Sequence, residues 1–367
     1  MRNVLQRTSL ILLGLIGALL IAELLLQIFP MPNRFTLIRK LEGLWEPDDD
    51  LLLKLRPGLD VHIWEHPEFD FNIRTNQMGL RDGEQKQPAP IAAIGDSFTF
   101  GFGVEASESW PEQLQQKSQM RVANLGWAGW SSYVYPATIR RYAIPFESNV
   151  WIWMFYSNDL PESHSAYEFY SSGVDNYLDW APEARFNLTE MRFPYNSRLL
   201  QALVAFSNPE LRYLPGSGDG EFDVMGTKMR YSPYAWETTD PTDPAVKSGW
   251  ILTEEALVHA HTLALEYEAS LVLVFAPNRE HVYWRYLESA MPGFDVKQLD
   301  DVETRLRAFC AANEIPYLDL LPAFRAQADE GKILYFPADG HWLPSGHSLA
   351  AEEIYRFLVQ EKLIPMR

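Results

Sequence analysis

A serine, a histidine and an aspartate that lie far apart in the sequence have the side-chain types needed for nucleophilic acyl transfer. Ser97 follows the apolar run 91–94 and a glycine-aspartate pair. A short apolar run that ends at glycine is typical of a buried strand in a parallel sheet, and catalytic groups gather beyond the carboxyl ends of such strands. Serine needs a nearby base, and His341, with Asp339 two residues before it, could supply one.

Two further segments could stabilise the negative charge that develops on an attacked carbonyl oxygen. Gly129 lies in a glycine-containing stretch after a short strand-like segment, and Asn158 follows the apolar run 150–156. A glycine N–H and an asparagine amide are suitable donors to an oxyanion. Together with the backbone N–H of Ser97, we expect them to form an oxyanion hole.

In this order the segments resemble the sequence blocks of the SGNH (GDSL-type) hydrolase family, which are matched here by Gly95-Asp96-Ser97, Asn124-Leu125-Gly126-Trp127-Ala128-Gly129, Tyr156-Ser157-Asn158-Asp159 and Asp339-Gly340-His341. The resemblance implies that Ser97 is the nucleophile and His341 the general base, with Ser97, Gly129 and Asn158 forming the oxyanion hole. It also implies the fold, a three-layer α/β/α flavodoxin-like sandwich with a central, mostly parallel five-stranded sheet.

The final block departs from the family pattern, because its acid and histidine are separated by two positions instead of three. Residues i and i+2 of an extended chain share a face, and a bend at Gly340 is the other route by which Asp339 could reach His341. A backbone carbonyl is the alternative orienting group. His347 is the alternative base, although the Pro-Ser-Gly sequence before it is typical of a turn into a helix.

Two other features have structural alternatives to a catalytic role. Asp and Ser cap helices well, so the Gly-Asp-Ser tripeptide could be only a helix start. Tyr156 stands where the family's third block usually has glycine, which affects the loop shape more than the Asn158 amide. Cys310 is expected to be a small buried hydrophobe within a helix over 301–313.

The elements that position these residues are predicted from the apolar patterning. We expect buried strands at 91–95, 150–156, 270–276 and 316–320, and a short strand before Asn124. Beyond the helix at 301–313, we expect helices at 251–269 and 349–362. Alternating strands and helices of this kind predict a parallel sheet between helical layers.

Composition limits the classes of partner. The chain has 367 residues, 47% of them hydrophobic, which is enough for one large core and an insertion. Its net charge of −18 argues against nucleic acid as a partner. The single cysteine excludes an intramolecular disulfide, and the eight histidines show no metal-binding spacing, so we expect neither a metal nor another cofactor.

The N-terminus predicts a membrane anchor. Arg2 and Arg7 precede an apolar stretch over 8–29, which is long enough to span a bilayer, and no convincing cleavage site follows it. We therefore expect residues 1–30 to be an uncleaved signal anchor in the cytoplasmic (inner) membrane. The catalytic domain is expected to be periplasmic or otherwise extracytoplasmic.

The remainder divides into a leader, residues 31–90, that packs on the core, and an SGNH hydrolase-like domain, residues 91–367. The domain carries an aromatic, acidic insertion at about 160–249, with a helix expected at 197–206. The insertion emerges at the catalytic edge of the sheet, where its aromatic residues could stack on sugar rings or fill its own core. Arg279 at the same edge could bind an anion or form a structural salt bridge.

These features predict a serine esterase that hydrolyses a carboxylic ester, such as an O-acyl group on a glycan or a small molecule, through an acyl-serine. An O-acyltransferase that uses the same site to acylate a polysaccharide is the first alternative. A non-catalytic, membrane-tethered glycan-binding protein is the second. The expected partners are the ester substrate and, through the N-terminal helix, the membrane.

Overall fold

The computed structural model describes residues 2–28, 40–41, 43–64, 66, 68–83, 88–174, 197–200, 202, 220–288, 290–291 and 295–366. Much of the predicted insertion, and most of the helix predicted at 197–206, lies outside these residues. Everything needed to build the proposed site lies within them.

A five-stranded sheet forms the centre of the molecule, with strand order β11-β10-β7-β5-β6. All neighbouring pairs are parallel, which confirms the predicted α/β architecture. All five residues of β5 are buried, as expected for a parallel strand covered on both faces. The strands are β5 (Ile91–Gly95), β6 (Val122–Gly126), β7 (Val150–Phe155), β10 (Ser270–Phe275) and β11 (Tyr317–Asp319).

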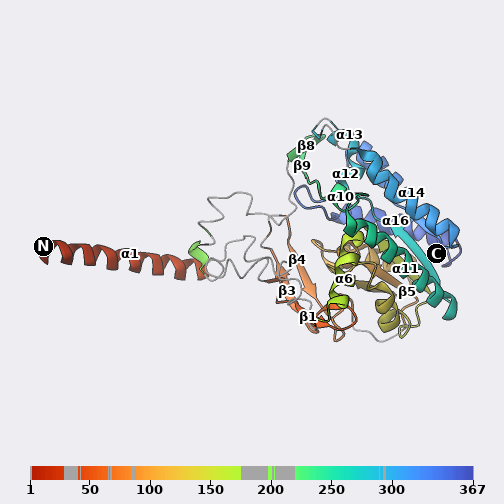
Figure 1. Cartoon of the computed structure of the whole chain (residues 1–367), viewed down its shortest axis with the longest axis horizontal. Helices are drawn as coiled ribbons and strands as arrows, with labels where there is room; N and C mark the ends of the chain where they lie inside the picture. Colours follow the sequence, from red (N-terminus) through yellow and green to blue (C-terminus); the bar gives the residue numbers. More distant parts are fainter. Residues whose placement is uncertain are drawn as a thin grey trace.

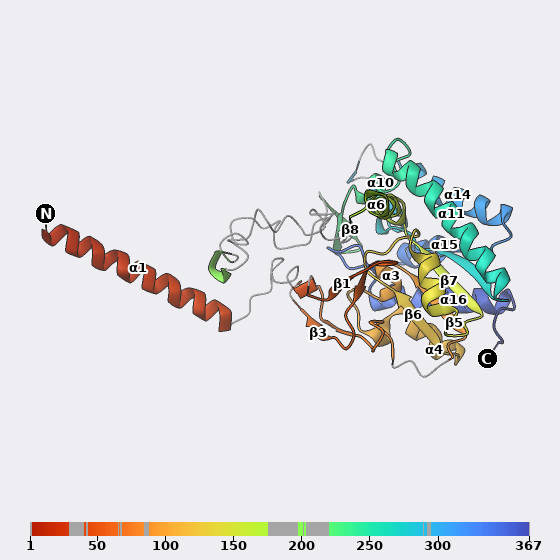
Figure 2. The same ribbon diagram turned by 60° about the horizontal axis from the view of Figure 1, so that its bottom comes forward.

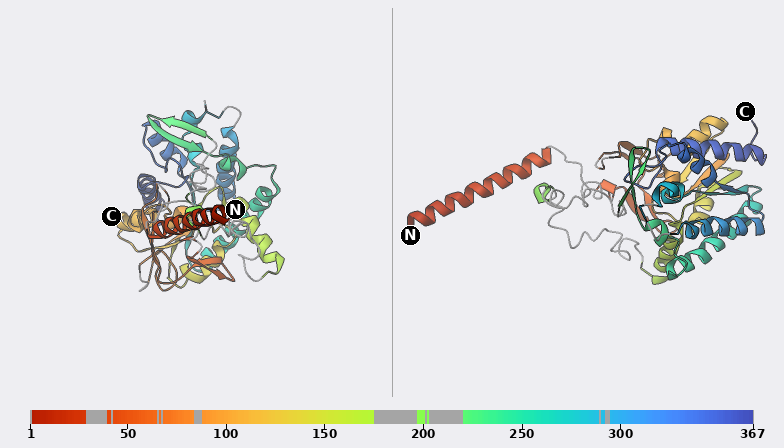
Figure 3. Two further views of the ribbon diagram at one scale, coloured as in Figure 1. Left: turned by 90° about the vertical axis from the view of Figure 1, so that its left-hand side faces the viewer. Right: turned by 90° about the horizontal axis from the view of Figure 1, so that it is seen from above.

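Helices cover both faces of the sheet. Figure 3 shows α11 (Pro244–Glu266) and α14 (Val296–Ala312) on one face, and α4 (Trp110–Ser118) and α16 (Pro344–Gln360) on the other. The other α-helices that the structure describes in the domain are α3 (Ser97–Phe100), α5 (Tyr135–Thr138), α6 (Asp159–Ser172), α10 (Tyr234–Glu237), α12 (Arg279–Val282), α13 (Trp284–Leu287) and α15 (Leu321–Asp329).

Three of these helices begin earlier than the apolar patterning predicted, because capping residues and prolines extend them. Asp243 and Asp295 cap α11 and α14 by accepting hydrogen bonds from backbone N–H groups in the first turn. Pro344 starts α16, since proline is favoured at the first helical position, where no N–H is needed. His347, expected in a turn, therefore lies inside the first turn of this helix.

The leader folds as two antiparallel hairpins, one of β1 (Trp45–Asp48) and β2 (Leu52–Leu55), the other of β3 (Asp60–Ile63) and β4 (Phe71–Arg74). They lie beside the sheet domain in Figures 1 and 2. Their inward side chains, such as Leu55, Phe71 and Ile73, are buried in the common core. The leader is thus an integral part of the packed domain.

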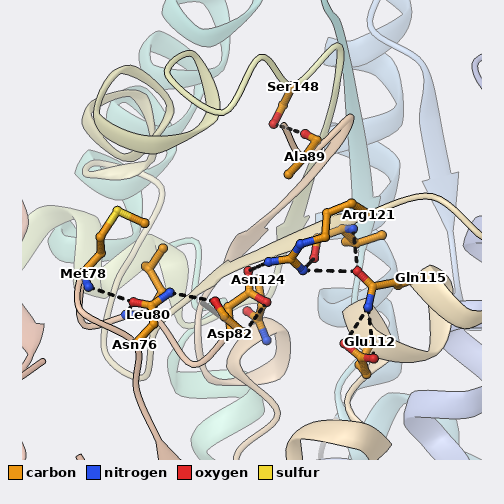
Figure 4. A network of polar contacts seen from close by, with 12 residues as sticks. Asn76, Met78, Leu80, Asp82, Ala89, Glu112, Gln115, Arg121, Asn124 and Ser148 are labelled. Carbon is orange, nitrogen blue, oxygen red and sulfur yellow. Dashed lines mark hydrogen bonds and ion pairs between the residues drawn. The ribbon is translucent and has the colours of Figure 1, made fainter. Parts of the chain in front are cut away.

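Polar contacts through Arg121 also connect the leader to helix α4. Arg121 donates to Asp82 at 2.8 Å and to Gln115 of α4 at 3.2 Å (Figure 4). The Asn76 side chain accepts hydrogen bonds from the N–H groups of Met78 and Leu80, which shapes the turn before this contact.

The described part of the insertion contains α6, α10 and a hairpin of β8 (Gly220–Val224) and β9 (Thr227–Tyr231). Phe222 and Trp236 are only 4% and 5% exposed. For these two aromatic residues, the interpretation as core side chains is the one that the packing supports.

At the other end, α1 (Arg2–Ile28) stands apart from the packed domain in Figures 1 and 2. Residues Gln6–Ile28 are long and apolar enough to cross a membrane, and none of the span is buried against the protein. A signal sequence has the same properties, so the helix is a candidate membrane span by length and composition.

Candidate active site

The turn from β5 into α3 places Ser97 at the carboxyl edge of the sheet. Ser97 is the first residue of α3, and Asp96 caps this helix by accepting the N–H of Phe98 at 2.9 Å. Gly95 is needed in the turn, since a Cβ there would lie 2.2 Å from Thr99 Oγ1. The helix-start interpretation is therefore correct for Asp96, and it leaves the Ser97 side chain available at the edge.

Ser97, His341 and Asp339 are joined by hydrogen bonds. Ser97 Oγ lies 2.8 Å from His341 Nε2, and His341 Nδ1 lies 2.5 Å from Asp339 Oδ1. Asp339 Oδ1 also accepts the backbone N–H of His341 at 2.8 Å, which closes a tight turn across Gly340. The two-residue spacing is thus compatible with contact between the acid and the imidazole.

The electrostatics of this pair suit a base that gains a proton during the reaction. Burial raises the pKa of Asp339, but the charge of His341 and the hydrogen bonds from its ring and backbone outweigh burial and lower the pKa to about 2. Burial lowers the pKa of His341, yet the Asp339 carboxylate shifts it above its usual value. The pair therefore favours an imidazolium beside a carboxylate.

Aromatic side chains hold the imidazole in place. The rings of Phe98 and Phe102 lie 5.2 and 5.0 Å from the His341 ring. Both phenylalanines come from the segment that begins at Ser97, so the loop that carries Ser97 packs against the His341 ring.

Gly129 and Asn158, the other two residues expected at the oxyanion hole, line the same cavity as Ser97. Gly129 has a φ of +95°, a conformation that favours glycine, and a Cβ there would meet nothing within 4 Å. Asn158 precedes α6, and its Nδ2 donates to Glu162 at 3.1 Å. The structure thus gathers all five sequence-predicted residues at one edge of the sheet.

The alternative base and the cysteine lie in different surroundings. His347 is 1% exposed and accepts the backbone N–H of Trp110, and burial lowers its pKa to about 3. Cys310 is fully buried within α14, and burial raises the pKa of its thiol to about 12. Neither environment favours acid-base or nucleophilic chemistry.

Arg279 has a structural role. Its guanidinium pairs with Glu280 at 2.8 Å and donates to the backbone carbonyl of Asp339 at 3.0 Å. It is 2% exposed, so it braces the loop that carries the acid. Of the two interpretations open from the sequence, the salt bridge is the one present.

The cavity around Ser97 has a volume of about 390 Å³ and is lined by both apolar and polar side chains, which we call its apolar and polar walls. The apolar wall comes from the leader and from the segments after β5 and β6, and includes Leu44, Trp45, Leu55, Ile73, Phe100 and Trp127. The polar wall includes Glu162, Ser232, Tyr234, Arg279 and Glu280.

Sequence reasoning missed two leader residues that support the site. The Glu68 carboxylate accepts the backbone N–H groups of Ala338 and Asp339 at 2.9 Å each. The buried Arg81 guanidinium donates to the carbonyls of Phe100 and Gly101, just after Ser97. No local pattern identifies either contact, because both partners are distant in the sequence.

Glu162 was also missed, although a signal existed. It follows Asn158 by four residues, a spacing that puts two side chains on the same face of a helix.

Among the residues that the structure describes, no group of three or more His, Cys, Asp or Glu side chains could hold a metal ion.

Comparison with solved structures gives similarities of low identity. They include a protein of the G-D-S-L lipolytic family from Desulfitobacterium hafniense (14% identity, TM-score 0.38, 73% of this chain and 98% of that chain). A GDSL-like lipase from Bacteroides thetaiotaomicron matches with 13% identity and a TM-score of 0.37, over 76% of this chain and 93% of that chain. With TM-scores below 0.5, neither carries weight in the assignment.

No curated protein matches this chain. Residues 245–365 match the family model described as SGNH hydrolase-like domain, acetyltransferase AlgX. This segment contains Asp339 and His341 but not Ser97, Gly129 or Asn158, whose convergence on His341 comes from the structure. Over these residues the chain is similar to an SGNH hydrolase-like domain, which confirms the resemblance predicted from the sequence for this segment.

Proposed function

We propose that this protein is a serine hydrolase that cleaves carboxylic esters through an acyl-serine on Ser97. The observation that carries the proposal is the unbroken hydrogen-bond chain from Ser97 Oγ through the His341 ring to Asp339 Oδ1. A neutral serine becomes a nucleophile when an oriented base takes its proton, and this chain provides both the base and its orienting acid.

In the proposed mechanism, His341 Nε2 removes the Ser97 proton as Oγ attacks the ester carbonyl. The N–H groups of Ser97 and Gly129, with the Asn158 amide, hold the oxyanion of the tetrahedral intermediate. The imidazolium then protonates the departing alkoxide, which leaves an acyl-serine. Water, deprotonated by His341, releases the carboxylic acid and restores Ser97.

The two walls of the cavity support an ester with an apolar acyl group and a polar alcohol, such as an O-acyl group on a glycan. The apolar wall beside Ser97 suits the acyl group, and the polar wall, with Ser232, Tyr234 and Glu280, suits a hydroxylated alcohol. Tyr234 presents an aromatic ring there, which also suits stacking on a sugar.

A second candidate is an O-acyltransferase, in which a sugar hydroxyl replaces water in the second half of the reaction. The family model matched by residues 245–365 is described by its acetyltransferase member, which favours this candidate. To distinguish the hydrolase from the transferase, the release of acid from an aryl ester is measured with and without an acetyl-free polysaccharide. Acyl transfer to the polysaccharide at the expense of acid release would identify the transferase.

The tethered glycan-binding protein needs no activated serine. It would bind oligosaccharides equally well as the wild type and as Ser97→Ala, and neither would react at Ser97. The intact hydrogen-bond chain at the edge of the sheet favours the enzyme.

We also place the catalytic domain outside the cytoplasm, tethered to the inner membrane by Gln6–Ile28. One N-terminal apolar helix before a large domain suits export, and the packed leader begins shortly after it. Protease added to spheroplasts should digest the domain if it faces outward and spare it if it faces inward.

The test of the enzyme proposal is fluorophosphonate labelling of the full chain in detergent, detected by intact mass. A single adduct is expected in the wild type, and none in Ser97→Ala or His341→Ala. Well-folded wild-type protein that takes up no reagent, or an adduct that persists in Ser97→Ala, would refute the proposal.

A further inference from the structure

Glu162 contacts the proposed oxyanion-hole amide directly. It lies on α6 one turn after Asn158, and its Oε1 accepts a hydrogen bond from Asn158 Nδ2 at 3.1 Å. Its side chain lines the cavity that contains Ser97. Among the residues that the structure describes, neither Asn158 Oδ1 nor Glu162 Oε2 has a hydrogen-bond partner, and both atoms are buried. One oxygen of each of these two side chains therefore has unused hydrogen-bonding capacity.

This arrangement directs the donor of Asn158 toward an acid. An oxyanion hole needs an N–H that points at the developing negative charge, and a carboxylate beside that donor competes with the oxyanion for it. A neutral carboxyl behaves differently, since its O–H can donate to Asn158 Oδ1. A half-turn of the amide would then satisfy Oδ1 and direct Nδ2 into the cavity.

We propose that Glu162 is a positioning residue for the oxyanion hole. As a neutral acid it donates to Asn158 Oδ1 and directs Nδ2 toward the oxyanion, and as a carboxylate it accepts from Nδ2 and withdraws it. The inference rests on the proposed function and adds a control on the same site: activity requires Glu162 to be protonated.

The surroundings of Glu162 favour the neutral form at neutral pH. Burial, and then the charge of Asp96, raise the pKa of Glu162 to about 8, although the Asn158 hydrogen bond opposes them. The titratable groups around it are Asp96 before α3, Asp159 on α6, Tyr135 on α5 and Tyr234 on α10, none of which is cationic. Ionisation of Glu162 would thus add negative charge to an acidic cluster.

The test measures the second-order rate constant of fluorophosphonate labelling of the full chain between about pH 6 and pH 10. Protonation of His341 would itself slow labelling towards low pH, so only the alkaline side is used. We expect the wild-type rate to fall tenfold or more above about pH 8, toward the loss of about 10²-fold typical of a missing oxyanion donor.

Glu162→Gln is the decisive variant, because its amide N–H can donate to Asn158 Oδ1 but cannot ionise. We expect it to keep the neutral-pH rate within about threefold and to lose the alkaline decline. Asn158→Ala should be slow at every pH. Glu168→Gln, at an exposed acid on the same helix, should keep the wild-type profile.

Two results would overturn the inference while leaving the proposed function intact. One is an alkaline decline in Glu162→Gln equal to that of the wild type. The other is a Glu162→Gln rate as low as that of Asn158→Ala at all pH values, which would mean that the carboxylate itself is required. Absence of Ser97 labelling in the wild type would instead refute the proposed function.

Discussion

Asp339 has two hydrogen-bond roles that depend on different atoms of the same turn. Its Oδ1 accepts both the ring Nδ1 and the backbone N–H of His341. The contact with Nδ1 stabilises the imidazolium, and the contact with the backbone N–H holds the turn across Gly340. The acid therefore acts on the charge of the base as well as on its orientation.

Replacing Asp339 with Asn should separate these roles. The amide can still accept the backbone N–H, but it removes the charge that raises the pKa of His341. We expect a labelling rate lower by about 10²–10⁴-fold. Because the carboxylate raises the pKa of His341, the midpoint of the acid limb should also move to lower pH. A pH–rate profile with an unchanged midpoint would contradict this account.

At this scale the sequence pointed to the residues that the structure brings together at the proposed site, but not to the contacts around them. Residue type and strand-end position pointed to Ser97, and the Asp339-Gly340-His341 block pointed to His341. The Asp339–His341 contact remained open, because either an extended chain or a bend at Gly340 could produce it, and the bend is what occurs. The contact between Glu162 and Asn158 depends on where α6 begins, which sequence patterns locate poorly.

At the scale of elements, the leader supports the loops of the site. Glu68 accepts two backbone N–H groups of the loop that carries Asp339, and Arg81 donates to carbonyls of the loop after Ser97. Hydrogen bonds to charged groups are stronger than neutral ones, about 1.5–3 kcal/mol. The leader thus acts on the nucleophile and on the base through separate contacts.

Glu68→Ala should therefore slow labelling without removing any group that touches substrate. We expect a rate about tenfold lower, since the turn at Asp339 loses its two backbone acceptors. Asp70→Ala is the matched control, because Asp70 lies on the same segment, is exposed and pairs with His62. Equal rates in the two variants would show that Glu68 has no influence on the site.

His347 on α16 is expected to make the free energy of unfolding fall as the pH falls. Its pKa is about 3 in the folded chain, below the usual 6.5, because burial disfavours the charged ring. Between these pH values the unfolded chain binds a proton that the folded chain does not, so stability falls as the pH falls through this window, by up to about 1.4 kcal/mol per pH unit.

His347→Gln should weaken that dependence, because glutamine can accept the Trp110 N–H without titrating. Urea unfolding of both proteins, followed by tryptophan fluorescence from about pH 7 to pH 4, tests this. We expect the stability difference between the wild type and the variant to shift in favour of the variant as the pH falls. Parallel curves would exclude His347 as the source.

At the scale of the whole molecule, the sheet was predictable and the leader was not. Most strands of the sheet are short apolar runs readable from local sequence, although β6 continues past its predicted end, through Asn124 to Gly126. The strands meet in parallel because helices connect them. The leader's role depends on contacts such as that of Glu68 with Ala338, which are 270 residues apart. Local patterns contain no information on such pairs, so the leader's place at the site became visible only in the structure.

This arrangement predicts where the chain can be shortened. A chain that begins at residue 40 keeps both leader hairpins, whereas one that begins at residue 88 keeps Ser97 and His341 but loses the hairpins. The shorter chain lacks buried side chains that include Leu44, Leu55, Ile63, Phe69, Phe71 and Ile73. At about 1.5–3 kcal/mol each, their loss is comparable to the 5–15 kcal/mol stability of a typical domain.

We therefore expect the chain from residue 40 to be monomeric and to label at Ser97 at the full-length rate. The chain from residue 88 should aggregate or remain unlabelled, even though it contains the complete proposed triad and oxyanion hole. Size-exclusion chromatography and intact-mass labelling measure both outcomes. A soluble chain from residue 88 that labels at the full-length rate would mean that the apolar wall and the Glu68 and Arg81 contacts are dispensable. In that case the catalytic edge would be built by the sheet domain alone.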